Sequence, residues 1–117
     1  MIHAKFVFDQ KKRVESFYLT GHAEYAESGK DIYCSAASAI TQTVIGTLTE
    51  ILEAGRDFVY LNQAGEIDCR ILNYDNLPQD KKIAARSLML SAYIGLKQIE
   101  MIDGQEFLSI EKVEEYQ

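Results

Sequence analysis

The sequence predicts a protein of the α/β (α+β) class, a two-layer sandwich in which two helices cover one face of a mixed or antiparallel sheet. Three observations lead to this prediction. Apolar and polar residues alternate in five short segments, as they do in strands. Two longer segments repeat apolar residues at helical spacing. The segments follow one another in the order ββαββαβ, and two helices with one apolar face each suffice to cover one side of a sheet.

The first two segments, residues 2–9 and 13–21, are expected to form an antiparallel hairpin around the polar connection "DQKK". Strict alternation assigns the apolar residues of the first strand to one face: Ile2, Ala4, Phe6 and Phe8. In the second strand it places two sets of residues on opposite faces: Val14, Ser16 and Tyr18 against Glu15, Phe17 and Leu19.

A helix is predicted over residues 32–53, where one stripe contains Ile40, Val44, Leu48 and Ile51 or Leu52. Gly55 fits a C-terminal cap for this helix. Gly46 lies in the middle of the helix and costs roughly 1 kcal/mol relative to Ala. We therefore expect close packing against the sheet or the other helix at Gly46.

A second hairpin is expected over residues 58–62 and 66–72, with Cys69 on its apolar face. Pro78, the only proline, can start a second helix, which is predicted to reach about Met101. Its apolar residues repeat at helical spacing: Ala85, Met89, Ala92, Leu96 and Ile99. Residues 106–113 are expected to form the last strand. The predicted elements account for the chain as one domain, residues 1–117.

Composition restricts the class of protein. The chain has 117 residues, of which 47% are hydrophobic and 26% charged, and no apolar run approaches the roughly 20 residues of a membrane helix. The N-terminus lacks the pattern of a secretion signal, so we expect a cytoplasmic protein with two free thiols and no membrane partner. A formal charge of −6 argues against direct nucleic-acid binding and favours a basic protein or peptide as partner.

The stretch "TGHAEYAESGKDIYCSAAS" brings His22 and Cys34 within twelve positions of each other. If the helix starts after Asp31, Cys34 is its third residue, where the macrodipole and free N–H groups favour the reactive thiolate. The same N–H groups are suited to bind the oxyanion formed during attack on a carbonyl. His22 is then the candidate proton donor for a leaving amine.

Structural interpretations of the same residues remain open. A free Cys is usually a buried packing residue, and a lone His in a loop is usually a surface residue. A zinc site built from His3, His22, Cys34 and Cys69 lacks the close ligand pair of structural zinc sites, so we expect no metal. The glycines form no phosphate-binding fingerprint, so we expect no nucleotide cofactor.

The segment from Gly21 to Ser38 resembles the signature of the ribosomal-processing cysteine protease family. That signature joins Gly-His-Ala to a short loop containing Gly, then Asp-Ile-x-Cys, and a Ser one turn beyond the Cys. The matching positions here are Gly21, His22, Ala23, Gly29, Asp31, Ile32, Cys34 and Ser38. The chain departs from the common pattern at Tyr33, where Val is more usual, and in having Ser35, Ala36 and Ala37 in place of Ala-Ala-Val.

The resemblance implies a cytosolic, cofactor-independent endopeptidase with a Cys34–His22 dyad. Its substrate would be the N-terminal extension of a basic large-subunit ribosomal protein, and the enzyme would be a homodimer. The resemblance also implies a mobile substrate loop over the site, which here comprises Ala23, Glu24, Tyr25, Ala26, Glu27, Ser28, Gly29 and Lys30.

Three further residues are candidates for supporting the site. Asp31 either caps the helix or orients His22, and the cap is favoured because helix chemistry alone accounts for it. Ser38, four residues after Cys34, is expected on the same helix face, where it lines the pocket or hydrogen-bonds near the dyad. Gly21 is expected to permit a turn or a close backbone approach.

Two other functions fit the same residues. The first is a ribosome-associated binding module without catalysis, in which Cys34 only packs. The second is a thiol hydrolase or transferase that acts on a small acyl substrate with the same pair. An extended groove favours a peptide substrate, whereas a closed pocket favours a small molecule.

Overall fold

The computed structural model describes residues 1–21, 30–104 and 107–116. Its elements follow the predicted order. They are β1 (Ile2–Phe8), β2 (Val14–Thr20), α1 (Lys30–Ile51), β3 (Phe58–Gln63), β4 (Glu66–Ile71), α2 (Gln79–Ile99) and β5 (Leu108–Glu114). A 3-10 turn at Tyr74–Asn76 precedes α2, and a π-helical turn at Glu100–Gly104 follows it.

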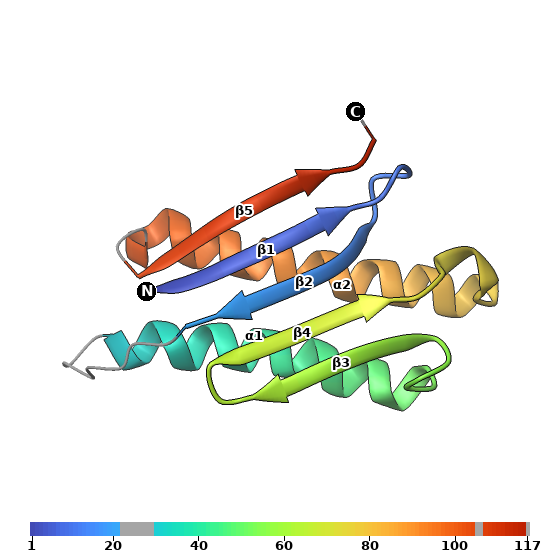
Figure 1. Cartoon of the computed structure of the whole chain (residues 1–117), viewed down its shortest axis with the longest axis horizontal. Coiled ribbons are helices and arrows are strands. Elements are labelled where there is room, and N and C mark those ends of the chain that lie inside the picture. Colours follow the sequence, from blue (N-terminus) through green and yellow to red (C-terminus); the bar gives the residue numbers. More distant parts are fainter. Residues whose placement is uncertain (22–29, 105–106, 117) are drawn as a thin grey trace.

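The five strands form one sheet in the order β3-β4-β2-β1-β5. Among the described strands, β1 and β5 run parallel and the other neighbouring pairs run antiparallel, so the sheet is mixed. Both helices cover the same face of the sheet (Figure 1). The predicted fold class and element order are therefore confirmed.

The core lies between the sheet and the two helices. The inward residues of β1 that strict alternation predicts are all buried, and Val44 and Leu48 of α1 pack against them with Met89 and Leu96 of α2. The opposite face of the sheet carries mainly polar side chains, among them Lys5, Tyr18 and Arg70. The sheet thus has one buried face and one face turned to solvent, as its sequence alternation requires.

A β-bulge changes which face of the sheet the first residues of β2 occupy. Phe8 pairs with Val14, but Val7 pairs with Ser16, so Glu15 is the extra residue in the ladder. Val14 is consequently buried together with Phe17 and Leu19, and not placed with Ser16 and Tyr18 as strict alternation predicts. The prediction failed here because one inserted residue shifts a period of two by one.

The close helix contact lies at Gly95 and not at Gly46. Gly46 is exposed, and a Cβ added there would have no atom outside its own helix within 4 Å, so the prediction of close packing at Gly46 was wrong. At Gly95 of α2, a Cβ would lie 3.0 Å from the Ile40 side chain of α1. Glycine at this position lets the two helices approach closely.

The end of α1 also differs from the prediction. The helix stops at Ile51, and Gly55 has φ +89° in the turn that leads into β3, where its N–H donates to the Phe58 carbonyl. Gly55 therefore forms a turn and does not cap the helix. Among the described helices, none combines the length and the apolar character that crossing a membrane requires.

Candidate active site

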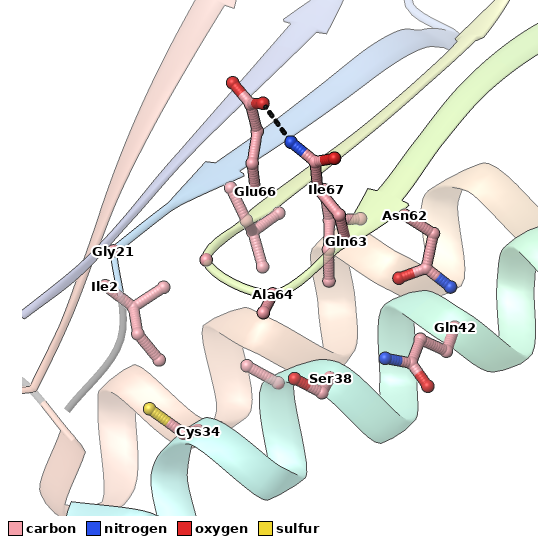
Figure 2. A pocket seen from close by; sticks show the side chains of 13 residues that line it. Ile2, Gly21, Cys34, Ser38, Gln42, Asn62, Gln63, Ala64, Glu66 and Ile67 are labelled. Atoms are coloured by element: carbon pink, nitrogen blue, oxygen red, sulfur yellow. Dashed lines mark hydrogen bonds between the residues drawn. The ribbon is translucent and has the colours of Figure 1, made fainter. Parts of the chain in front are cut away.

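A cavity of about 470 Å³ lies between the N-terminal half of α1 and the turn that joins β3 to β4 (Figure 2). Cys34, Ser38 and Gln42 line it from α1. These three residues are spaced four apart, so they lie above one another on one helix face. The rim is open, since Gln42 and Asn62 on its two sides are both exposed.

The structure places the start of α1 earlier than predicted. The helix begins at Lys30, so Asp31 is its second residue and not the residue that caps it, and Lys30 belongs to the helix and not to the expected loop. Cys34 becomes the fifth residue, where a backbone N–H is already bonded within the helix. Cys34 therefore lies two residues further from the free N–H groups at the helix start than a third position would place it.

Gly21 closes one end of the cavity. Its φ is +88°, and a Cβ added to it would collide with the carbonyl oxygen of Met1. Its N–H donates to the carbonyl of Gly65 in the β3–β4 turn at 3.1 Å. The backbone at Gly21 therefore makes both the turn and the close approach expected from the sequence, and only glycine satisfies both without strain.

The β3–β4 turn that forms the opposite wall is held in place by Glu66. The Tyr18 hydroxyl donates to one oxygen of the Glu66 carboxylate at 2.6 Å, and the Gln63 side-chain amide donates to the other at 3.1 Å. The hydrogen bond to Glu66 raises the pKa of the Tyr18 phenol, since it stabilises the protonated form. Both oxygens are fixed, so this wall of the cavity is preorganised.

A model of the family described as cysteine protease Prp matches residues 1–107 of the chain. The chain belongs to the cysteine protease Prp family. It is accordingly a cysteine protease. Of its two cysteines, Cys34 lines the cavity and Cys69 does not. No curated protein matches the chain.

Solved structures agree with this assignment in fold. SMU.848 from Streptococcus mutans is 24% identical over 97% of this chain and 95% of its own, with a TM-score of 0.73. An essential ribosomal processing protease Prp from S. aureus, in complex with a substrate peptide, is 20% identical over 96% and 99%, with a TM-score of 0.73. The same S. aureus protease with a covalently linked product peptide is 21% identical over the same shares, with a TM-score of 0.75.

The two cysteines of this Prp family member occupy different environments. Cys34 is half-buried at the cavity, whereas Cys69 has no exposed surface and lies 3.9 Å from the sulfur of Met89. Burial raises the pKa of the Cys69 thiol to about 12, which keeps it protonated. Cys69 is therefore a packing residue, as its place on an apolar strand face predicts.

The three described residues of the alternative zinc site lie in different places. His3 lines a groove on the open face of the sheet, Cys69 is in the core, and Cys34 is at the cavity. In the part of the chain that the structure describes, no three His, Cys, Asp or Glu side chains are grouped to hold a metal. His22 and the loop residues 23–29 lie outside the described residues, and so does the side chain of Asp31.

Gln42 and the β3–β4 turn line the cavity and were not predicted from the sequence. Gln42 was within reach, because the four-residue spacing that connects Cys34 to Ser38 continues to it. Asn62 carried no such signal, since it meets α1 only through the long-range pairing of the sheet. Figure 2 shows Asn62 and Gln42 on opposite sides of the same end of the cavity.

Proposed function

We propose that this chain is an endopeptidase that removes the N-terminal extension of a large-subunit ribosomal protein, with Cys34 as nucleophile and His22 as general base and acid. The observation that carries the proposal is that Cys34 and Gly21, the residue immediately before His22, line one open cavity. Membership of the cysteine protease Prp family supports the chemistry. The ribosomal processing activity named for the S. aureus protein supports the substrate.

In this proposal His22 takes the thiol proton of Cys34, and the resulting thiolate attacks the carbonyl carbon of the scissile bond and forms a tetrahedral oxyanion. His22 gives a proton to the leaving amine, and the acyl group remains on Cys34 as a thioester. A water molecule, deprotonated by His22, then releases the acyl group and regenerates the thiol. The favourable end of the macrodipole weakens beyond the first turn, so His22 contributes most of the activation of Cys34.

The shape of the cavity supports a peptide substrate over a small acyl molecule. Its rim is open and runs along two turns of α1, from Gln42 to Cys34 (Figure 2). Small-molecule sites enclose most of the surface of their ligand, whereas extended peptides lie in open grooves. The net charge of −6 also favours encounter with a basic ribosomal protein.

The experiment is incubation of the purified chain with a peptide that spans the N-terminal extension of its matching ribosomal protein, followed by mass spectrometry. The proposal predicts a single cut, no cut in a scrambled peptide, and no hydrolysis of a small thioester. Binding of the peptide without a cut under reducing conditions would favour the non-catalytic module. Thioester hydrolysis without peptide cleavage would favour the acyl hydrolase.

The proposal extends to a cytosolic homodimer that does not bind nucleic acid directly. The resemblance of the segment from Gly21 to Ser38 to the family signature supports the dimer, and the acidic charge supports the absence of nucleic-acid binding. Analytical ultracentrifugation at micromolar concentration tests the dimer. The measured molecular mass should be twice the 13.3 kDa of one chain. A monomer at this concentration would contradict it.

A further inference from the structure

We infer that the substrate binds as an added strand on the outer edge of β3, which delivers it into the Cys34 cavity. The inference rests on the proposed peptidase function and specifies how the substrate is held. β3 is the outermost strand of the sheet, and no described strand pairs with its outer side (Figure 1). Five of its six residues are exposed.

The edge of β3 lacks the features that usually protect such strands from pairing. Edge strands commonly carry Lys, Pro, an inward charge or a bulge. The sequence of β3, FVYLNQ, contains no charge and no proline, and its register with β4 is regular over six pairs. Val59, Tyr60 and Leu61 leave 39%, 46% and 40% of their surface exposed. This edge is therefore suited to accept an extended polypeptide.

The pairing with β4 shows which backbone groups face outward. The Leu72 N–H donates to the Asp57 carbonyl, so residue 57 and every second residue after it bond toward β4. Tyr60 and Asn62 fall between these positions and turn their N–H and C=O groups to the outer edge. Phe58 does so too, but its carbonyl already accepts from the Gly55 N–H. Within the described part of the chain, the outer edge of β3 thus offers two donors and two acceptors, at Tyr60 and Asn62.

The edge leads directly into the cavity. Asn62 belongs to both, since its backbone is on the edge of β3 and the residue lines the cavity opposite Gln42 (Figure 2). Gln42 lies eight helical positions after Cys34, a rise of about 12 Å. An extended chain covers that length with about three to four residues. A strand seated on β3 therefore places its scissile bond at Cys34 three to four residues beyond Asn62.

The sharpest variant is Asn62→Pro, which removes one outward N–H and no bond to β4. Proline is tolerated on an edge strand when its nitrogen faces solvent. The matched control is Asn62→Ala, which removes the same side chain but keeps the N–H. One lost hydrogen bond is expected to lower kcat/KM of Asn62→Pro about threefold to tenfold below that of Asn62→Ala. Equal kcat/KM values for the two variants, both with the wild-type melting temperature, would overturn the inference.

A second measurement stays decisive if Asn62→Pro unfolds. The wild-type chain is incubated with a series of substrate peptides. In each peptide, one backbone nitrogen is methylated within the segment that is proposed to pair with β3. An added strand predicts alternation: methylation at residues two apart slows cleavage about threefold to tenfold each, and methylation between them leaves the rate within about twofold. Slowing without a period of two would overturn the inference.

Failure of the inference is distinguishable from failure of the proposed function. If the unmodified peptide is not cleaved at all, the proposed function is wrong and the inference falls with it. If the peptide is cleaved but neither test shows backbone dependence at β3, only the inference is wrong. A change in sedimentation of Asn62→Pro without alternation in the peptide series would assign the edge to a second copy of the chain.

Discussion

The ring of Tyr33 stacks on the ring of Phe107, with centroids 4.7 Å apart and planes inclined by 20°. Tyr33 precedes Cys34 in α1, and Phe107 comes immediately before β5. The Phe107 carbonyl accepts a hydrogen bond of 2.8 Å from the N–H of Ile2 in β1. The stack therefore connects the beginning of α1, where Cys34 lies, to the end of the sheet where β1 and β5 begin.

This relationship predicts energetic coupling between the two rings. In a double-mutant cycle with Tyr33→Ala and Phe107→Ala, we expect a coupling energy of about 0.5–1.5 kcal/mol in urea unfolding. The peptidase rate should fall in both single variants, since either one loosens the turn before Cys34. Val is the more usual residue at this position of the family signature. Tyr33→Val should have the same effect on unfolding energy and peptidase rate as Tyr33→Ala. Strictly additive unfolding energies would contradict the role of the stack.

Gly21→Ala is expected to destabilise the chain more than Gly55→Ala. Both glycines have φ near +90°, so the two substitutions share a backbone cost of roughly 1–2 kcal/mol. Only at Gly21 does the added Cβ also collide with the Met1 carbonyl, whereas at Gly55 nothing lies within 4 Å. Urea unfolding measures the free energy of unfolding of the two variants. If Gly55→Ala lowered it as much as Gly21→Ala, the close approach of Gly21 to the Met1 carbonyl would be contradicted.

Gly46→Ala is expected to stabilise the chain by about 0.5–1 kcal/mol. Gly46 lies in the interior of α1 with open space around it, so alanine gains helix propensity without a clash. Gly95→Ala is the contrasting variant, because its Cβ would meet Ile40 at 3.0 Å. In thermal unfolding, the melting temperature should rise more for Gly46→Ala than for Gly95→Ala, because Ile40 must move to admit the added Cβ at position 95. A lower melting temperature for Gly46→Ala would contradict its exposed position.

The buried thiol of Cys69 predicts loss of stability at alkaline pH. Its pKa is raised from an ordinary value of 9.0 to about 12, so the folded state holds a proton that the unfolded state releases. The protonated Cys69 thiol contributes its full stabilisation to the folded state below about pH 9, and this stabilisation is lost as the pH rises toward 12. Burial also raises the pKa of Tyr74, so Cys69→Ala should flatten the decline without abolishing it. An unchanged slope of unfolding free energy against pH in Cys69→Ala would contradict this account.

The regular parts of the fold were predictable because their signals are local. Alternation located the strands, and helical spacing located Met89 and Leu96 on the buried face of α2. The bulge at Glu15 was not predictable, because alternation within one strand does not show where that strand holds a residue that its neighbour does not match. Helix propensity alone also could not distinguish Gly46 from Gly95, since only the packing of Ile40 shows which glycine is needed.

The site was predictable only in the part that is contiguous in sequence. The segment from Gly21 to Ser38 contains Cys34 and the turn before His22, and its residue types alone indicated thiol chemistry. The opposite wall comes from the β3–β4 turn, which reaches α1 through strand pairing across the sheet. No local pattern specifies such a contact, so Asn62 and the edge of β3 required the structure.

The central claim, that Cys34 and His22 form the catalytic pair, is tested most directly by comparing three variants on the same substrate peptide. We predict that Cys34→Ser and His22→Ala lose the single cut seen with the wild type, and that Cys69→Ser, which alters the buried thiol, retains it when folded. Mass spectrometry of the products at equal enzyme concentration gives the answer. Cleavage by Cys34→Ser at the wild-type rate would contradict the account.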